Sequence, residues 1–486
     1  MSRIRFRWVF CQLDTLRQCL PSSLRHTLEE LPESLDETYE RIVMDIKKAN
    51  SAQAYRMLQC LAVAIRPLSV AELAELLAFE FDAAKGGIPK LNANWRWEDH
   101  EQAVLSTCSS LITIVPTPNS TVVQFSHFSV KEFLLSHRLA SSTKDISRYH
   151  IVLEDANTVI ARACLGILLR DPVDQNDADA DANSVSLAQY AARYWVTHAQ
   201  IKNVASRIRD GMEYLFDPYR PYFVAWVKLY NVDHRGWTSE LRSKMEPRAA
   251  PLYCAAFCGF HEIVEHLALK YPPYANAICG TGGTALHSAS NAGHVQVVRS
   301  LLKCGVDVDA RGFWNQSPLQ LASFQGHLDV VQCLLNHGAD AKFQDDNYRT
   351  PLSHAAETGY HEIVRVLLEH NADANSQDKD GLTPMHGAFW YGMSLSFGNS
   401  RGDYPQIVRL LLERGANPNA RDHKLRTPLH LLLSSGGASS SLLEITRILL
   451  AHGADVDAED SERQTPFQLA SGQTEIVQLL SEYRSK

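Results

Sequence analysis

A four-residue phrase returns through the second half of the chain at nearly regular spacing. Its clear copies begin at Thr284, Ser317, Thr350, Thr383, Thr427 and Thr465, and a degenerate copy begins at Ala250. The first three intervals between clear copies are 33 residues, and the next two are 44 and 38. A unit of this length cannot bury its own apolar face, so neighbouring units must stack into a solenoid with a continuous core.

The residue types in each unit predict a pair of helices. Thr or Ser is a favoured helix N-cap, and the Pro that follows it, as at Pro318, suits the first helical position. A glycine such as Gly326, nine residues after the cap, provides a left-handed C-cap. The second helix then carries paired apolar residues, for example Val330 with Val331. This pattern is typical of ankyrin repeats, and residues 248–486 resemble about seven of them.

Residues 51–140 predict a domain of a different kind, with Ser69 as the N-cap of its second helix. The expected elements are helices over 52–65, 70–79 and 98–110 and strands over 111–115 and 121–125. The two β-branched runs flank a Pro/Asn turn, which indicates a β-hairpin. Three helices followed by a hairpin make a winged helix.

The remaining segments are also predicted to be helical. Residues 1–50 carry two helical patterns, the second with an acidic first turn. Residues 141–247 form a helical linker, with apolar faces over 156–169, 187–198, 204–215 and 223–230. The aspartates between Asp171 and Asn183 lack the Gly and Glu of a calcium-binding loop, so a solvated loop is expected there. The chain is therefore expected to be mainly α, with a small hairpin.

Four phrases in the first 140 residues resemble fungal NACHT-ankyrin proteins, which are NLR-like STAND NTPases. The phrases occupy residues 7–13, 31–39, 66–69 and 125–134. In that family they follow directly after the nucleotide-binding core, and the winged helix is similar to the one named after GPI inositol-deacylase-like proteins. The resemblance implies a sensor half, in which ankyrin repeats recognise a ligand and the winged helix restrains an NTPase.

The sequence gives no support for catalysis. A P-loop needs G-x-x-x-x-G-K-[ST], and the chain contains no such string. We therefore expect no ATP hydrolysis, no nucleotide cofactor and no enzyme activity. His127 resembles loosely a STAND histidine that contacts ADP, but a hydrogen-bonded structural histidine is the favoured interpretation. One alternative stays open, namely that the chain is the C-terminal part of a split or truncated NACHT NTPase whose ATP-binding core lies upstream.

Charge and composition exclude several classes of partner. The net charge is −8, and the expected recognition helix of the winged helix begins with Glu98 and Asp99, so we expect no nucleic-acid binding. No apolar run approaches the ~20 residues of a membrane-spanning helix. The 10 cysteines show no C-x-x-C pairs, which predicts core thiols in a reducing compartment and a cytoplasmic protein.

The 20 histidines do not predict a metal site, because the repeat accounts for many of them. His287, His386 and His430 fill the fourth position of the phrase, and His294 and His327 follow the capping glycine. Three others, His337, His370 and His452, lie in the last turn of second helices, where a cation suits the helix dipole.

A protein partner is expected on the concave face, which hairpin tips and first helices line in such a solenoid. The eighth position of the first helix supplies Phe257, Asn291, Phe324, Glu357 and Trp390. Exposed aromatic residues and arginine dominate binding energy at protein interfaces. The predicted partner-binding residues are Phe313, Trp314, Phe324, Tyr348, Arg349, Trp390 and Tyr391. The leading hypothesis is a non-catalytic protein-binding or regulatory protein.

Overall fold

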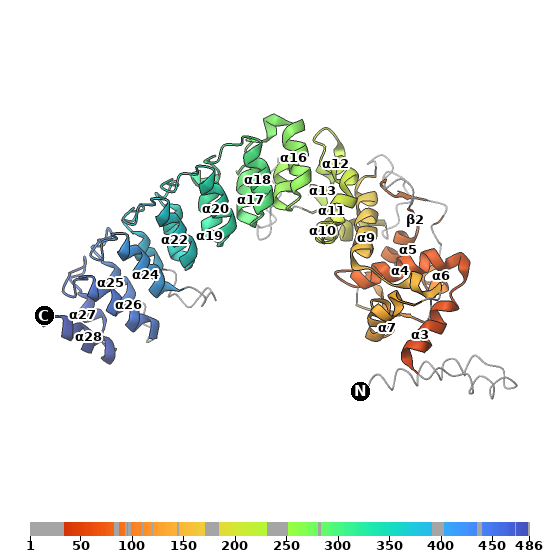
Figure 1. Ribbon diagram of the computed structural model, residues 1–486, viewed down its shortest axis with the longest axis horizontal. Helices are drawn as coiled ribbons and strands as arrows, with labels where there is room; N and C mark the ends of the chain where they lie inside the picture. Colours follow the sequence, from red (N-terminus) through yellow and green to blue (C-terminus); the bar gives the residue numbers. More distant parts are fainter. Residues whose placement is uncertain are drawn as a thin grey trace. The chain divides into compact units, whose positions relative to one another are not determined.

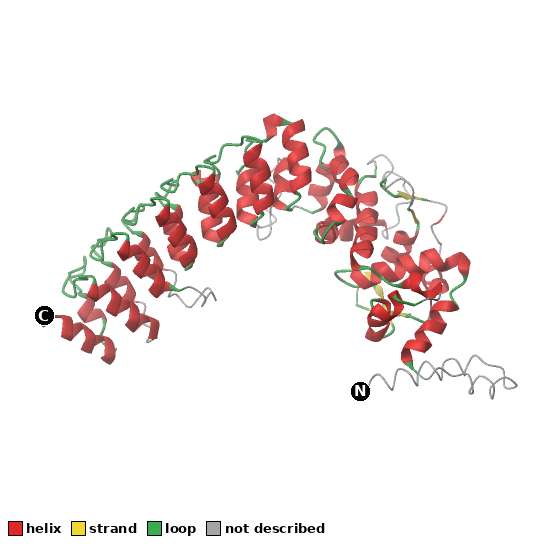
Figure 2. Ribbon diagram, viewed as in Figure 1, coloured by secondary structure: helices red, strands yellow, loops and turns green. Residues whose placement is uncertain are grey.

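The chain divides into two compact units, Met1–Val232 and Asp233–Lys486 (Figure 1). The computed structural model describes residues 34–81, 87–92, 95, 99–108, 110–118, 120–142, 145–170, 184–230, 251–279, 283–390, 403–434, 440–471 and 473–484. Helices make up most of both units, and strands occur in the first (Figure 2). This confirms the predicted fold class.

The first unit contains the predicted winged helix. Its helices are α3 (Leu35–Met44), α4 (Ser51–Val63), α5 (Val70–Leu77), α6 (His100–Cys108), α7 (Phe128–Leu134), α8 (His137–Ala140), α9 (Leu153–Leu168), α10 (Ser184–Ala199), α11 (Val204–Arg207), α12 (Arg209–Leu215) and α13 (Pro221–Leu229). Short 3-10 turns are η1 (Lys48–Asn50) and η3 (Asp145–Tyr149). The predicted second helical pattern of residues 1–50 is α3, with Ser34 as N-cap and Asp36 and Glu37 in its first turn. The first pattern lies outside the described residues.

The wing is an antiparallel sheet in the order β1-β5-β4. Its strands are β1 (Leu68–Ser69), β4 (Ile112–Pro116) and β5 (Thr121–Phe125). Val123 of β5 lies opposite Ile114 of β4 and opposite Leu68 of β1. The predicted hairpin is therefore confirmed, and the short strand β1 adds a third member to it. A second small sheet pairs β2 (Phe79–Glu80) with β3 (Lys90–Leu91).

Two helices predicted in this unit differ from those in the structure. The helix expected over 70–79 ends at Leu77, because Phe79 pairs with Leu91 and is fully buried in a strand. The helix expected over 204–215 is two helices, because the backbone of Ile208 (φ −113°, ψ 13°) leaves the helical region while its side chain stays buried.

The predicted linker packs into the same compact unit as the winged helix. Helix α9 lies against α10 and α4, and α10 also contacts α5. Trp195 of α10 and Trp226 of α13 meet edge to face, with ring centroids 5.5 Å apart. The predicted domain boundaries at 50, 140 and 247 stay predictions.

The second unit is a stack of helix pairs (Figure 1). The pairs are α15 (Pro251–Phe257) with α16 (His261–Lys270), α17 (Ala285–Ala292) with α18 (Val295–Lys303), α19 (Pro318–Gln325) with α20 (Leu328–Asn336), α21 (Pro351–Thr358) with α22 (His361–Glu369), α23 (Pro384–Trp390) with α24 (Tyr404–Glu413), α25 (Pro428–Ser434) with α26 (Ser440–Ala451), and α27 (Pro466–Leu469) with α28 (Thr474–Arg484). Two 3-10 turns, η5 (Pro272–Tyr274) and η6 (Phe313–Asn315), lie between pairs. Each first helix packs on the next first helix, and each second helix on the next second helix.

Glycine joins consecutive pairs as well as ending helices. Gly326 caps α19 with φ +85°, as predicted. A Cβ at Gly326 would lie 2.4 Å from the ring of Tyr360, which belongs to the following repeat. Gly293 meets the ring of His327 in the same way. The cap must therefore be glycine for its backbone angle and for the close approach of its neighbour.

The loops between pairs form a continuous hydrogen-bonded edge, drawn as green loops in Figure 2. In four successive contacts a backbone N–H of one hairpin tip donates to a carbonyl of the tip before it. These bonds run from Asp346 to Trp314 (3.1 Å), Lys379 to Asn347 (3.0 Å), His423 to Asp380 (2.9 Å) and Ser461 to Lys424 (2.9 Å). The side chains on neighbouring tips are consequently held in a fixed order.

Candidate partner-binding surface

The histidines of the repeated phrase are structural bridges. In His386 the Nδ1 atom accepts from the Thr383 backbone N–H at 3.2 Å, and Nε2 donates to the Arg426 carbonyl at 3.1 Å. His287 and His430 make the equivalent pairs of bonds. Burial lowers the pKa of His287 and His430, and lowers that of His386 to about 4. These histidines join one repeat to the next.

The other repeat histidines are also bound to backbone. Nδ1 of His337, His370 and His452 lies 2.8–2.9 Å from the carbonyl oxygen four residues earlier, at the end of a second helix. Within the described residues, no group of three His, Cys, Asp or Glu side chains is placed to hold a metal ion.

Three of the predicted aromatic residues lie exposed on two adjacent hairpin tips. Phe313, Trp314 and Tyr348 are 52%, 60% and 54% exposed. The rings of Phe313 and Trp314 stack, with centroids 5.1 Å apart and an interplanar angle of 24°. The Lys379 ammonium lies 5.6 Å from the centre of the Tyr348 ring. Phe313, Trp314 and Tyr348, with Phe324 described below, are called the aromatic surface.

The backbone beneath these aromatics is unusual for such residues. Trp314 (φ 52°), Asn315 (φ 59°) and Tyr348 (φ 58°) all adopt left-handed angles. In the later hairpin, Oδ1 of Asp345 accepts from the backbone N–H groups of Asn347 and Arg349, which stabilises the tight turn. Gly312 takes the place of that aspartate in the earlier hairpin, because a Cβ there would approach Nε2 of His287 to 2.7 Å.

A hollow of about 690 Å³ lies between these two tips. Arg311, Lys342, Phe343, Tyr348 and Lys379 are among the residues that line it. The Arg311 guanidinium stacks over Phe343 at 5.1 Å from the ring centre. Asp340, Asp345 and Asp346 also line the hollow, so the aromatic surface has charged side chains of both signs at its border.

Arg349, another predicted contact, is committed to an ion-pair network. Its Nη1 lies 3.4 Å from Oε2 of Glu357, and its Nε lies 3.9 Å from Oδ2 of Asp378. Its side chain is 27% exposed. Burial raises the pKa of Glu357, although Arg349 and His354 oppose that shift. Arg349 thus organises the floor of the concave face.

Phe324, in α19, is 43% exposed at the eighth position of its helix. Its ring meets the buried His354 of α21 edge to face, with centroids 5.7 Å apart. Trp390 ends α23, but its side chain lies outside what the structure describes, and Tyr391 lies wholly outside it. Glu357 could be predicted to lie on the concave face because it occupies the eighth position of its first helix. Nothing in the sequence singled out His354, Asp345 or Asp378.

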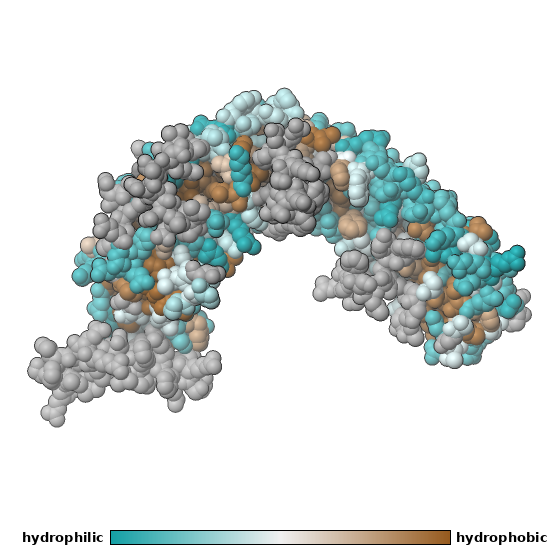
Figure 3. Space-filling view, turned by 180° about the vertical axis from the view of Figure 1, so that it is seen from behind, coloured by the Kyte–Doolittle hydropathy of each residue, from teal (hydrophilic) through white to brown (hydrophobic). Residues whose placement is uncertain are grey.

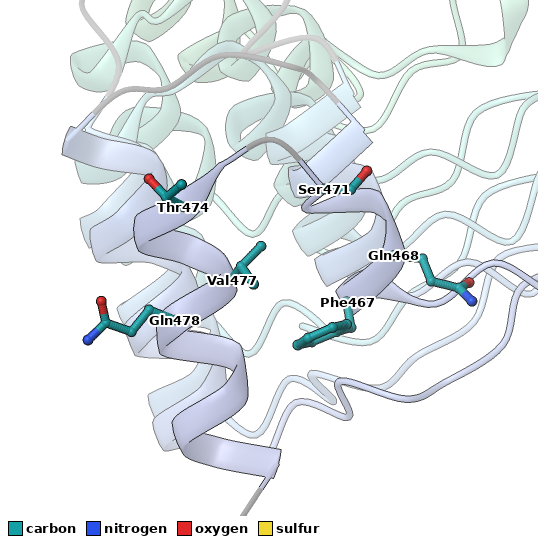
Figure 4. A pocket seen from close by; sticks show the side chains of 6 residues that line it. All are labelled: Phe467, Gln468, Ser471, Thr474, Val477 and Gln478. Carbon is teal, nitrogen blue, oxygen red and sulfur yellow. The ribbon is translucent and has the colours of Figure 1, made fainter.

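A second hollow, of about 780 Å³, lies on the last helix pair (Figure 4). Phe467 of α27 and Val477 of α28 point toward one another across it (Figure 4). Their counterparts Leu319 and Val331 in an earlier repeat are fully buried, because the next repeat covers them. Figure 3 likewise shows hydrophobic residues at the surface near this end of the second unit. The last pair thus keeps the apolar floor of an internal repeat within a polar rim of Gln468, Ser471, Thr474 and Gln478.

The winged helix shows structural roles for the residues that the sequence singled out there. His127 is the N-cap of α7: its Nδ1 accepts from the Ser129 backbone N–H at 3.3 Å. The Ser129 hydroxyl lies 2.6 Å from the same nitrogen and 2.8 Å from the Tyr39 hydroxyl. Asp99 accepts from two N–H groups at the start of α6, so the acidic residue there caps a helix. His127 therefore has the structural role that the sequence favoured.

Two family models match this chain. The model described as "Ankyrin repeats" matches residues 237–312, 319–422 and 395–486, and the model "GPI inositol-deacylase, winged helix domain" matches residues 39–144. The ankyrin matches cover about half of the chain. The chain therefore belongs to the ankyrin-repeat family, and a winged helix precedes its repeats.

Two curated proteins are similar to parts of this chain. "Azaphilone pigments biosynthesis cluster protein L" of Monascus ruber is 31% identical over 296 residues, which are 58% of this chain and 61% of that protein. Alpha-latrocrustotoxin-Lt1a of Latrodectus tredecimguttatus is 35% identical over 71 residues, 15% of this chain and 5% of the toxin. The chain thus spans less than two thirds of either relative.

Solved ankyrin domains match the second half of the chain. The ankyrin repeat domain of Bcl-3, of the IkappaB family, is 26% identical, covering 48% of this chain and 97% of that one, with a TM-score of 0.41. The human ASB11 ankyrin repeat domain is 25% identical, with the same coverage and TM-score. Within the described part of the chain, no helix is long and apolar enough to cross a membrane.

Proposed function

We propose that this chain is a non-catalytic regulatory protein whose ankyrin repeats bind a protein partner through the aromatic surface. The observation that carries the proposal is the exposure of Phe313, Trp314 and Tyr348 on two hydrogen-bonded hairpins. Large exposed aromatic residues are costly on a surface that contacts only water, and they supply most of the energy at protein interfaces.

The hairpin backbone fixes the position of these rings. A left-handed conformation costs a non-glycine residue about 1–2 kcal/mol, and Trp314 and Tyr348 both adopt it. The angle at Tyr348 recurs at the equivalent residues Asn315, Gly381, Leu425 and Arg463, so it belongs to the hairpin turn of the repeat and does not itself mark a binding site. The hairpins present their rings without reorganisation, which lowers the entropic cost of binding.

The experiment is a pull-down with the full chain from an extract of its source, compared with the Trp314→Ala/Tyr348→Ala double variant. Tyr219→Ala is the matched control, because Tyr219 is 78% exposed in the first unit. We expect a partner that the wild type and the control capture and the double variant loses. Undiminished capture by a folded double variant would place the site elsewhere.

We further propose that the chain works as the sensor half of a fungal NLR-like system, without ATPase activity of its own. The winged helix followed by ankyrin repeats supports this role, and the relative from Monascus ruber supports the fungal setting alone. The competing proposal, that the chain belongs to a NACHT NTPase with its core encoded upstream, draws on the same order of domains. An in-frame P-loop in the transcript upstream of Met1 would favour the competitor, and ATP turnover by the purified chain would refute our proposal.

A further inference from the structure

Three cationic side chains line the hollow of about 690 Å³ between the hairpin tips without forming an ion pair. They are Arg311, Lys342 and Lys379, all exposed, and none of them meets a carboxylate in an ion pair within the described part of the chain. Arg311 donates one N–H to Oδ1 of Asn315 at 2.9 Å. Its other N–H groups, and those of the two ammonium groups, have no hydrogen-bond acceptor among the described residues. The hollow therefore contains a set of unused hydrogen-bond donors.

Aromatic rings hold two of these cations in position. The Arg311 guanidinium lies 5.1 Å from the centre of the Phe343 ring, and the Lys379 ammonium lies 5.6 Å from the centre of the Tyr348 ring. Both rings line the same hollow. The attraction between a cation and the face of a ring restrains the cation and leaves its N–H groups free to donate to another molecule. A ligand that enters the hollow thus meets donors that are already oriented, which lowers the entropic cost of binding.

Two of the three carboxylates that line the hollow are engaged in the turns. Oδ1 of Asp345 accepts from two backbone N–H groups, and its side chain is 3% exposed. Oδ1 of Asp340 accepts from the Lys342 backbone N–H at 2.8 Å. Asp346 is the one acid of the hollow whose side chain has no hydrogen bond among the described residues. The formal charges of the three acids and the three cations cancel, so the unused donors, and not the net charge, determine which group the hollow binds.

We propose that the hollow receives the carboxylate of an aspartate or glutamate side chain from the protein partner. The two carboxylate oxygens accept charge-assisted hydrogen bonds from the three cations, and the methylene stem packs against the Phe343 and Tyr348 rings. A basic side chain would fit less well, because Asp346 is the one carboxylate with unused capacity. The inference rests on the proposed function, since Tyr348 belongs both to the aromatic surface and to this hollow. The bound segment therefore carries an acidic residue next to the apolar residues that cover the aromatic surface.

The experiment is a selection of displayed random peptides on the full chain, with Trp314→Ala/Tyr348→Ala used to discard binders at other sites. We expect the remaining peptides to be enriched in Asp or Glu at one position. Replacing that acid by its amide should lower the affinity for the wild type roughly tenfold. The same replacement should change the affinity for Arg311→Gln/Lys379→Gln much less, because this variant has already lost most of the donors.

Charge reversal gives a result that a loss of structure cannot produce. A peptide whose acid is replaced by Lys should bind Arg311→Glu/Lys379→Glu more tightly than it binds the wild type. Lys303→Gln is the control, because Lys303 is an exposed lysine at the end of α18 and does not line the hollow. The affinity of the selected peptides for this control should equal their affinity for the wild type.

Peptides that depend on Trp314 and Tyr348 but show no acidic preference, or that bind Arg311→Gln/Lys379→Gln as tightly as the wild type, overturn this inference and leave the proposed function standing. Enrichment in Arg or Lys would show that Asp346 governs the hollow, and it overturns the inference in the same way. A selection that yields no peptide dependent on Trp314 and Tyr348 overturns both. Thermal unfolding of each variant verifies that it is folded.

Discussion

Nε2 of His386 donates a hydrogen bond to the backbone carbonyl of Arg426, 3.1 Å away in the hairpin before the next repeat. Nδ1 of the same ring accepts from Thr383, so the neutral ring with its proton on Nε2 fits both bonds. In an earlier repeat Gln320 does the same, because its Oε1 accepts from the Ser317 N–H and its Nε2 donates to the Arg349 carbonyl. The fourth position of the phrase therefore holds consecutive repeats together.

The bridging histidines make the stability of the array depend on pH. The folded-state pKa of His386 is lowered from 6.5 to about 4 by burial. Its contribution is fully present above pH 6.5 and is lost as the pH falls toward 4, because the unfolded chain binds the proton first. The loss is on the order of 3 kcal/mol for this residue. We expect urea unfolding of the full chain to show lower stability at pH 4.5 than at pH 7.5.

His386→Gln provides the control for that titration, because glutamine carries no charge. Its stability should fall less between the two pH values than that of the wild type. An identical fall in both proteins would show that other groups cause the acid sensitivity, His198 among them, whose pKa burial also lowers to about 4.

At neutral pH, two substitutions of His386 distinguish a variant that loses its hydrogen bonds from one that keeps them. His386→Ala leaves the Thr383 N–H buried without its partner, at about 1–3 kcal/mol. It also removes one of the two hydrogen bonds of the Arg426 carbonyl, which still accepts from the Asp422 N–H. His386→Gln should retain both bonds, as Gln320 does, and cost less than about 1 kcal/mol. Amide hydrogen exchange in α23 and α25 measures the difference. Equal exchange in the two variants would contradict the bridging role.

Two glycines with the same backbone angle should respond differently to alanine. Gly326 (φ +85°) has the Tyr360 ring 2.4 Å from the position of a Cβ, whereas Gly338 (φ +87°) has no atom within 4 Å. Gly338→Ala should lower the free energy of unfolding by about 1–2 kcal/mol, because alanine is strained at the left-handed angle. Gly326→Ala should lower it by roughly 1–3 kcal/mol more, because its Cβ also overpacks against the Tyr360 ring. Thermal unfolding should therefore rank the variants wild type, Gly338→Ala, Gly326→Ala. Equal shifts would mean that the ring of Tyr360 moves aside at little cost.

In the first unit, Arg66 holds a buried carboxylate. Its Nη1 and Nη2 atoms bind Glu72 at 2.9 and 2.5 Å, and the Glu72 side chain is 2% exposed. Arg66→Met should cost about 2–4 kcal/mol, because the carboxylate stays buried without its cation. Adding Glu72→Gln should recover part of the loss, since a neutral amide can still accept from the Ser69 N–H. Circular dichroism during heating measures both, and a double variant no better than the single one would refute this reasoning.

Most of the repeat architecture could be predicted because its determinants are local. Caps, glycines and paired apolar residues act within one unit, so Ser317, Gly326 and Val331 occupy their expected places. The hairpin of the winged helix could be predicted for the same reason, because its two strands are neighbours in the sequence. The exposed rings of Phe313, Trp314, Phe324 and Tyr348 lie where the sequence placed them, and their role in binding stays a prediction.

The contacts between repeats depend on how the units stack, and the sequence of a single unit does not specify them. The sequence by itself determined the repeating helix pairs, because a short phrase specifies where each helix begins and ends. Only the tertiary structure committed Arg349 to Glu357 and Asp378, and set the Phe324 ring against His354 in the next helix. Asp378 and His354 lie one hairpin or one repeat beyond Arg349 and Phe324, so those two distances follow from the way one helix pair packs on the next, whereas Arg349 and Glu357 meet within one repeat.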